Sequence, residues 1–431
     1  MKNQIVNHDE RYIAEVTPQS ELVVTMGGGL GGQPHTDAFG RLRVSEPQTV
    51  FNNTFVSDLN PLEFSNSLVG NGAITHVPAQ ASARLSTGGT ASGDKAVLQT
   101  KRYVRYQPGK SQQVFLTSNL GAPKANVRQR VGLFDDNNGL FFEQTEAGAS
   151  VNIRTSTSGS PVITSIPQSD WNIDTLDGMG PSGINLDLSQ AQIFVIDFQW
   201  LGVGRIRFGF DINGLLYYCH EVLNANQSVI VYMATPHLPV RAEIENTAIA
   251  ASLTTMDQFC MSVCSEGGVD EGVPKPFAAG RGITPLGVTT RRPVLSLRPR
   301  TTFNSLTNRG HITLASHQIV VNTNNVLWEL VLNGSLTGAS FANVDTVNSI
   351  ADIDTAATAI TGGVVIARGF AVAGGGTGTI QTSTSQLSDA LKHFELYNDF
   401  TGLAPDTLSL VMTSFTATSN INACFNWTEQ K

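Results

Sequence analysis

Apolar and polar residues alternate along most of this chain, in short runs separated by turn-forming residues. The stretches 97–107 and 254–264 alternate clearly, and 192–222 is the densest stretch of this kind. Its two faces are made of alternate residues: Ile193, Val195 and Asp197 on one, and Phe194, Ile196, Phe198 and Trp200 on the other. A period of two is that of a β-strand, whose successive side chains point to opposite faces. The pattern therefore predicts many short strands.

Asn-Gly pairs lie between apolar runs at two places, Asn138-Gly139 and Asn213-Gly214. Both residue types adopt the positive φ angles of the tight turns that join antiparallel strands. We therefore predict a β-hairpin at each pair. Short strands at regular spacing, joined by hairpin turns, are typical of a β-sandwich.

Changes in composition divide the 431 residues into four parts. Residues 1–60 predict an extended N-terminal arm that packs on its own domain or on a neighbouring subunit, and 61–265 predict the main β-sandwich domain. The stretch 266–289 is rich in Gly and Pro and lacks periodicity, which indicates a connection between domains. Residues 290–431 are strand-like again and predict a second, jelly-roll-like sandwich.

One helix is expected near the C-terminus. In residues 385–397, Leu387, Leu391 and Phe394 recur at the i, i+4 and i+7 spacing of a single helical face. The sequence thus predicts an all-β chain with two β-sandwich (jelly-roll-like) domains, an extended N-terminal arm and this one short helix.

Charged residues make up only 14% of the chain, and the net charge is −8. Binding to nucleic acid requires clustered Lys and Arg that displace counterions from phosphates. The densest basic stretch, from Arg291 to Arg300, is short and interrupted by prolines. We therefore expect no nucleic-acid partner.

Cysteine usage and hydropathy indicate where the protein is made. The four cysteines, Cys219, Cys260, Cys264 and Cys424, include no CxxC pair, so they predict free, mostly buried thiols and no structural zinc site. The opening residues lack the apolar core of a signal peptide, and no apolar run approaches the roughly eighteen residues of a membrane span. We expect synthesis in a reducing cytoplasm, without membrane insertion.

The glycines of 27–32 match the G-x-G-x-x-G pattern of dinucleotide-binding turns and follow a predicted strand. That mechanism needs a helix directly afterwards, whose N-terminus holds the pyrophosphate. Pro34 and Gly40 follow instead, without helical periodicity. A flexible loop is the favoured interpretation, and no cofactor is expected.

Asp135, Asp136 and Asn137, just before Gly139, raise the question of a calcium loop. An EF-hand that begins at Asp135 requires Gly at its sixth position, where Leu140 stands instead. A hairpin tip is the simpler interpretation, so we predict no metal site, although the sequence leaves open whether calcium sits at 135–139.

Acidic residues are densest around Trp171, at Asp170, Asp174, Asp177 and Asp187. Paired carboxylates can serve a glycosidase, but Asp beside Gly and Pro more often forms turns and caps. Trp171 is expected in a loop, where its ring would be able to stack on a sugar. Trp171, Asp174 and Asp177 are therefore the candidate residues for binding at the surface.

The eight histidines are scattered and fall into no metal-ligand spacing. Neither HExxH nor G-x-S-x-G occurs, so neither a metalloprotease nor an esterase is indicated. We predict no catalytic residues and no enzyme activity.

The stretch DAFGRLRVSEP (37–47) resembles the N-terminal signature of a widespread family of virion structural proteins from tailed phages and large viruses. Further blocks follow in the family's order, so that the resemblance covers nearly the whole chain. They are KRYVRYQPGKSQQVFLT (101–117), NVRQRVGLFDDNNGLFFEQ (126–144), QSDWNIDTLDGMGPSGINLDLSQAQIFVIDFQWLGVGRIRFGF (168–210), VYMATPHLPVRAEIEN (231–246) and SEGG (265–268), with VLWELVLNG and FNWTE in the C-terminal part. Separately, 192–222 is similar in pattern to part of a concanavalin-type jelly roll.

The family resemblance implies a component of the virus particle, of the kind placed in tails, baseplates, fibres or on the capsid surface, and it brings no catalytic residue. We expect a homo-oligomer, trimer or higher, that assembles with other virion proteins, and we favour the tail apparatus over the head. A virion module that binds a host glycan or receptor, and a capsule depolymerase, are the rival hypotheses. The sequence leaves open the position on the particle, the symmetry, and whether the arm is exchanged between subunits.

Overall fold

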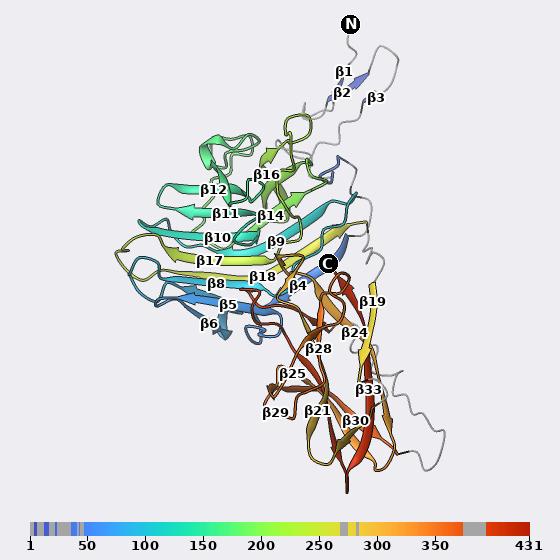
Figure 1. Cartoon of the computed structure of the whole chain (residues 1–431). Coiled ribbons are helices and arrows are strands. Elements are labelled where there is room, and N and C mark those ends of the chain that lie inside the picture. Colours follow the sequence, from blue (N-terminus) through green and yellow to red (C-terminus); the bar gives the residue numbers. More distant parts are fainter. Residues whose placement is uncertain are drawn as a thin grey trace. The chain divides into compact units, whose positions relative to one another are not determined.

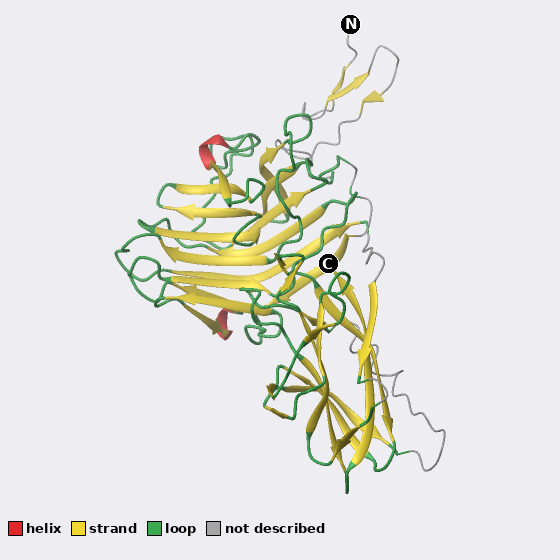
Figure 2. Ribbon diagram, in the orientation of Figure 1, coloured by secondary structure: helices red, strands yellow, loops and turns green. Residues whose placement is uncertain are grey.

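The computed structural model describes residues 4–6, 13–16, 22–23, 36–40, 43, 47–267, 275–281, 284–373 and 394–431. Their regular structure is β-strand apart from two 3-10 turns, η1 (Pro78–Gln80) and η2 (Gln168–Asp170), so the all-β prediction is confirmed (Figure 2). The chain forms two compact units, Met1–Gln99 with Val104–Asp270, and Thr100–Tyr103 with Glu271–Lys431. Among the described residues, no helix has the length and apolar character that a membrane span requires.

The first unit contains two large antiparallel sheets (Figure 1). One sheet has the strand order β13 (Val162–Pro167), β12 (Gly148–Thr155), β11 (Gly139–Thr145), β10 (Val127–Phe134), β17 (Val240–Asn246), β8 (Lys95–Thr100) and β5 (Phe64–Val69). The other has the order β16 (Leu215–Val222), β15 (Ile206–Ile212), β14 (Gln192–Phe198), β9 (Gln112–Asn119), β18 (Thr255–Glu266), β7 (Ser82–Ser86) and β6 (Ala73–Val77), and β4 (Pro47–Thr54) pairs with β18. A separate small sheet consists of β1 (Gln4–Val6), β2 (Ile13–Val16) and β3 (Leu22–Val23).

A shared apolar core joins the two large sheets. Phe142 on β11 packs its ring 5.1 Å from that of Phe194 on β14, and 5.4 Å and 5.1 Å from those of Phe208 and Phe210 on β15. Burial of each such side chain stabilises the fold by about 1.5–3 kcal/mol. The first unit is therefore a β-sandwich, in which the alternate residues of each strand face the core.

The two predicted hairpins both occur, but their turns differ. Asn213 and Gly214 have φ angles of +54° and +79° and form the two-residue turn between β15 and β16. In the other hairpin, Phe134 pairs directly with Gly139, so the loop is 135–138 and Gly139 is already in strand β11. The Asp135 carboxylate shapes that loop by accepting hydrogen bonds from the backbone N–H groups of residues 137 and 138, both at 2.8 Å.

The structure differs from the predicted arm of residues 1–60. Strand β4 pairs with β18 over seven residue pairs, from Pro47↔Glu266 to Thr54↔Cys260, and Phe51 and Phe55 are buried in the sandwich core. Residues 47–60 of the predicted arm are thus part of the first unit, where β4 extends a sheet and Phe51 and Phe55 fill the core. The glycine tract 27–32 lies outside the described residues.

The second unit is also built from two antiparallel sheets (Figure 1). One contains β19 (Lys275–Gly280), β33 (Ser419–Gln430), β24 (His311–Val321) and β31 (Glu395–Leu396), with β20 (Leu286–Val288) also on β33. The other has the order β27 (Ala342–Asn343), β28 (Ala351–Asp354), β21 (Arg292–Pro299), β32 (Leu408–Ser414), β25 (Val326–Leu332) and β30 (Val364–Ala371). Two short hairpins pair β22 (Thr302–Phe303) with β23 (Leu306–Thr307) and β26 (Ser335–Thr337) with β29 (Ala359–Thr361).

Buried side chains from both sheets form the core of this unit, which makes it a second β-sandwich. Trp328 on β25 is buried and lies against His317 of β24, with 4.7 Å between the ring centroids. Trp427 on β33 is buried in the same core.

Two further predictions about this part of the chain need correction. Within the predicted connection 266–289, β19 and β20 form ladder pairs with β33 and so complete a sheet of the second unit. Of the predicted helix 385–397, residues 385–393 lie outside the described residues, and 395–396 form β31, which pairs with β24. The 3.6-residue spacing was therefore misleading at least at the end of that segment.

Candidate functional site

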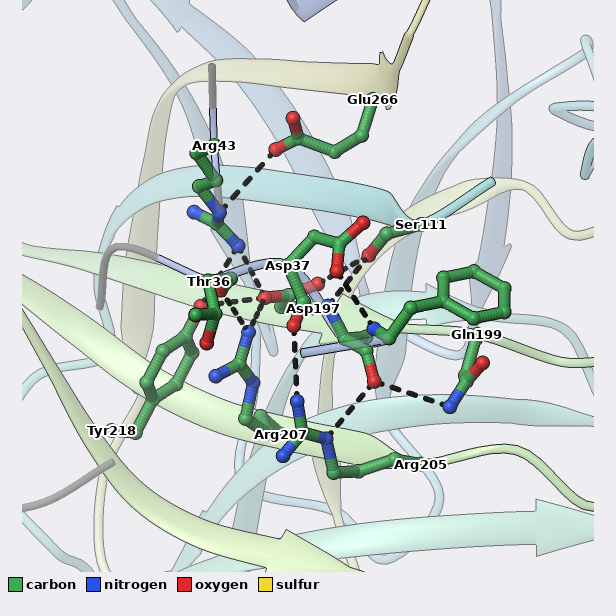
Figure 3. Close-up of polar contacts among 12 residues, drawn as sticks. Thr36, Asp37, Arg43, Ser111, Asp197, Gln199, Arg205, Arg207, Tyr218 and Glu266 are labelled. Atoms are coloured by element: carbon green, nitrogen blue, oxygen red, sulfur yellow. Dashed lines mark hydrogen bonds and ion pairs between the residues drawn. The ribbon is translucent and has the colours of Figure 1, made fainter. Parts of the chain in front are cut away.

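A buried carboxylate, Asp197 on β14, is the centre of a polar network on the outer face of the second sheet (Figure 3). The carboxylate accepts a hydrogen bond from the Tyr218 hydroxyl at 2.6 Å and one from the Ser111 hydroxyl at 2.7 Å. The guanidinium groups of Arg207 and Arg43 each form an ion pair with Oδ2 of the same carboxylate. Four donors thus surround one buried anion.

Strand pairing brings three of these groups together. Asp197 alternates with the core residues Phe194 and Ile196, so its side chain lies on the opposite face of β14. Arg207 is its direct partner in the β14–β15 ladder, where opposed side chains on one face are close neighbours. In the β15–β16 ladder, Tyr218 pairs with Gly209, next to a register shift between Phe208 and Gly209. The Arg207 guanidinium lies 4.1 Å from the centre of the Tyr218 ring.

We call residues 36–40 together with Arg43 the docked segment. Side chains on and beside the same sheet bind its main chain at residues 36–38. The bonds run from Arg207 to the carbonyl oxygen of Thr36 (2.7 Å), from Arg205 to those of Asp37 and Ala38 (both 3.0 Å), and from Gln199 to that of Ala38 (3.1 Å). In return, the Ala38 N–H donates to Ser111 Oγ at 3.2 Å. Side chains thereby satisfy the backbone carbonyl oxygens of residues 36–38.

The docked segment keeps its shape through its own turn. Asp37 accepts hydrogen bonds from the N–H of Phe39 on its carboxylate and from the N–H of Gly40 on its carbonyl oxygen, both at 2.9 Å. Gly40 has a φ of +78°, which glycine adopts at little cost. This turn is followed by Arg43, whose side chain returns to Asp197.

Opposite charges are paired in the network. Two cations, Arg43 and Arg207, face two buried anions, Asp197 and Glu266, and Glu266 Oε1 lies 3.5 Å from Arg43 Nε. Burial and the neighbouring Asp197 raise the pKa of Tyr218, so its hydroxyl stays protonated and donates. Buried ions are tolerated only when paired and hydrogen-bonded in this way. The Asp197 carboxylate is thus engaged by four side chains of the protein itself.

The sequence blocks that carry the family resemblance meet in this network. The block 37–47 supplies the docked segment with Arg43, the block 101–117 supplies Ser111, the block 168–210 supplies Asp197, Gln199, Arg205 and Arg207, and SEGG supplies Glu266. Sequence reasoning did not predict that these residues come together. One sequence feature could have indicated the network. Asp197 is the single charged residue in an apolar strand, and the next strand region carries Arg205 and Arg207 at alternate positions.

A shallow recess of about 260 Å³ adjoins the docked segment. It is lined by residues 38–40 of the segment, by Gln199 and 203–205, and by 223–225. Ligand pockets usually measure about 300–1,000 Å³, so this recess is small for a ligand site.

The predicted surface site around Trp171 is not formed as expected. Trp171 is only 4% exposed, packs against Phe210 and donates its ring N–H to a backbone carbonyl at 3.3 Å. Asp174 is 2% exposed, and its carboxylate accepts backbone N–H groups of Leu176 (2.9 Å) and Ser182 (2.8 Å). The expected exposure was wrong for both residues, since each fills a place inside a folded loop. Asp177 is exposed, and a binding role for it stays a prediction.

The acidic residues of this region behave as turn formers. Hydrogen bonds from the Met179 N–H and the Thr175 hydroxyl lower the pKa of Asp177, and bonds from Ser189 lower the pKa of Asp187. A glycosidase acid needs the opposite, a carboxyl whose pKa is raised.

The two carboxylates of the loop 135–138 bind groups of the protein itself. Asp135 caps the loop, and Asp136 pairs with Arg241 at 2.8 Å. In the described ranges there is no group of three or more His, Cys, Asp or Glu residues arranged to hold a metal ion.

A second buried ion network lies on the outer face of the other sheet. Glu243 on β17 is 1% exposed and pairs with Arg241 at 2.8 Å and with Arg130 and Lys95, both at 3.4 Å. Burial alone would raise the pKa of Glu243, but these cations lower it to about 2. The guanidinium of Arg130 also lies 5.1 Å from the centre of the Phe141 ring. This network, too, was not predicted from the sequence.

Comparison with known proteins identifies no family, because no protein-family model matches the chain and no curated protein matches it. Among solved structures, a glycoside hydrolase family protein from Mycobacterium thermorestibile is 13% identical, at a TM-score of 0.33, over 50% of this chain and 99% of that one. The CBM2 module of an evolved Dit from Lactobacillus casei phage J-1 is 10% identical, at 0.33, over 53% and 99%. A legume lectin-like domain from Entamoeba histolytica is 8% identical, at 0.30, over 50% and 96%.

Proposed function

We propose that this chain is a virion structural protein of a tailed bacteriophage, and that it builds the tail apparatus (tail, baseplate or fibre attachment) through oligomeric assembly. The partners in this proposal are further copies of the chain, as a trimer or higher oligomer, and other virion proteins. The protein is made in the host cytoplasm and resides in the virion.

The observation that carries this proposal is the convergence of the resembling blocks at Asp197. Four blocks that are far apart in the sequence provide the docked segment and most of the side chains that hold it. These blocks together form the attachment of the docked segment to the sheet. The carboxylate at its centre, Asp197, is bound by four side chains. An attachment held by this many side chains suits a protein whose task is to hold parts of a particle together, which agrees with the virion resemblance.

Immunogold electron microscopy of gradient-purified particles tests the proposal. Antibodies raised against the first unit are expected to label the tail region of the particles. Label confined to the capsid would instead favour the alternative of a capsid-surface decoration or head-fibre protein. Particles without label, in a preparation where the antibody detects the chain in the unassembled fraction, would contradict a structural role altogether.

A further inference from the structure

An open pocket of about 530 Å³ lies on the second unit, away from the docked segment in the sequence. It is bounded by the start of β19, the β22–β23 hairpin, the turn at 347–348 and the end of β33. Its lining consists of Lys275, Pro276, Phe277, Phe303, Asn304, Val347, Asn348 and Lys431. The volume falls within the range of about 300–1,000 Å³ that is usual for ligand sites.

Two aromatic rings give the pocket apolar faces. Phe277 is partly buried and stacks on Trp427 of the core, at 6.3 Å between centroids and an interplanar angle of 21°. Phe303, at the tip of the β22–β23 hairpin, is also only partly buried. The Lys431 ammonium lies 5.6 Å from the centre of the Phe277 ring and 4.7 Å from that of Phe303. The rings are therefore held in place and still accessible from the pocket.

Two lysines line the pocket. The Lys431 ammonium donates a hydrogen bond to the carbonyl oxygen of Asn348. Lys275 is exposed and forms no ion pair with any described residue, whereas Lys431 is 3.7 Å from Glu429. Glu429 is itself buried and committed, since it accepts hydrogen bonds from the Ser349 hydroxyl (2.5 Å) and the Ile350 N–H (2.8 Å). Burial, and to a smaller extent the nearby charge of Lys275, lower the pKa of Lys431. An anion placed between the two ammonium groups would relieve their repulsion.

Polar side chains complete the lining. Asn304 and Asn348 are exposed at the rim, on the hairpin and on the turn that Asp345 caps. Amide groups donate and accept hydrogen bonds, which suits a ligand with several hydroxyl groups.

We propose that this pocket binds an acidic saccharide, a sugar ring that carries a carboxylate. The apolar C–H face of the ring packs on Phe277 and Phe303, the carboxylate pairs with Lys275 and Lys431, and the ring hydroxyls meet the two Asn amides. Each part of the lining has a counterpart in this ligand class: an apolar face, one negative charge and hydroxyl groups. A neutral sugar would leave Lys275 without a charged partner among the described residues, and a simple anion would make no use of the two aromatic rings.

The inference goes beyond the structural role proposed above and does not depend on it. Calorimetric titration of the full chain with trigalacturonate, and with the neutral trisaccharide galactotriose as the matched probe, tests it directly. We expect trigalacturonate to bind at least about tenfold more tightly than the neutral sugar. Equal affinities, or heat from neither sugar at millimolar concentration, would overturn the proposal.

Three variants locate the site. Lys275→Gln is expected to weaken trigalacturonate binding about fivefold, and Phe303→Ala to weaken it at least as much. Lys110→Gln removes the same charge in the other unit and is expected to leave the affinity within about twofold. Lys275 and Phe303 are both at the surface of short strands, and circular dichroism verifies that their variants are folded. A loss as large in Lys110→Gln as in Lys275→Gln would mean nonspecific attraction and would refute the assignment.

Discussion

At the scale of single residues, the Asp197 carboxylate is fully buried, so it has lost its contact with water. Removing water from an ion costs several kcal/mol, and only well-placed partners offset that cost. Arg43 and Arg207 supply the opposite charge, while Tyr218 and Ser111 supply hydroxyl donors. The stability of the network therefore depends on the whole set of partners and not on any single pair.

Replacement of this carboxylate by an amide gives the first prediction. Asp197→Asn leaves two arginines without their shared anion, so we expect the free energy of unfolding of the first unit to fall by about 3–5 kcal/mol. Urea denaturation followed by tryptophan fluorescence measures the change. Asp58→Asn, at an exposed position whose cap an Asn also forms, is the control, with an expected change within about 0.5 kcal/mol. Equal effects in the two variants would show that the network adds no stability.

Glu243 gives a prediction about pH. Its pKa is lowered in the fold from 4.5 to about 2, so its ion pairs stabilise the fold fully above about pH 4.5 and progressively less as the pH falls toward 2. Unfolding midpoints of the wild type and of Glu243→Gln, measured at pH 7, 4 and 3, test this. We expect the variant to be less stable at pH 7, by on the order of 3 kcal/mol, and to lose less stability on acidification. Parallel pH profiles would contradict the assigned role.

At the scale of elements, the two Asn-Gly pairs illustrate what a short motif predicts. Asn213-Gly214 forms the two-residue turn that its residues favour. The pair at 138–139 marks a hairpin as well, but the turn lies at 135–138 because the Asp135 cap competes successfully for the backbone N–H groups. A motif therefore identifies the hairpin, whereas side-chain capping decides its exact turn.

The two glycines should respond differently to the same substitution. A Cβ at Gly139 would lie 2.0 Å from Cβ and 2.3 Å from Cα of Phe134, while a Cβ at Gly214 would meet no atom within 4 Å. We expect Gly139→Ala to cost about 3 kcal/mol or more, and Gly214→Ala to cost only about 1 kcal/mol for its positive φ. Urea denaturation of both variants provides the comparison, and a larger loss at Gly214 would refute the described register.

The docked segment can be tested through its attachment. Arg43→Met removes one cation from Asp197, so we expect the amides of Ala38, Phe39 and Gly40 to exchange with solvent at least about tenfold faster, because the turn is no longer held. Hydrogen–deuterium exchange with mass spectrometry measures this. Arg84→Met, which breaks the Arg84–Asp257 pair elsewhere on the sheet, is the control and should leave these amides unchanged. Unchanged exchange in Arg43→Met would mean that the backbone contacts suffice.

Segments without a clear pattern were the hardest to predict. Strands β19 and β20 lie in a Gly- and Pro-rich stretch, and they form only because β33 offers a long partner. Strand β4 lies within the stretch 1–60 for which the sequence predicts an arm, yet it pairs with β18 of the first unit. In both cases, tertiary pairing overrides the local signal.

At the scale of the whole molecule, local periodicity was enough to predict two sandwiches but not the sites on them. The alternation of 192–222 placed Asp197 on its correct face, yet its partner Arg43 is 154 positions away. An alternation of apolar and polar residues cannot predict a contact between residues so far apart in the sequence. The pocket of the second unit likewise combines residues that are far apart in the sequence, because Lys275, Phe303 and Lys431 line it together.

The blocks 37–47, 101–117, 168–210 and 265–268, on which the predicted virion resemblance rests, contain most of the residues of the Asp197 network. The sequence did not reveal that these residues attach a segment to a sheet. The structure supplies that attachment, and the proposed role in the particle combines the two observations.

A cryo-electron microscopy map of gradient-purified particles tests the central claim most directly. We predict density for several symmetry-related copies of this chain in the tail apparatus, each with the docked segment on Asp197. A complete map whose density is fully accounted for by other proteins, with this chain confined to the unassembled fraction, would contradict the account.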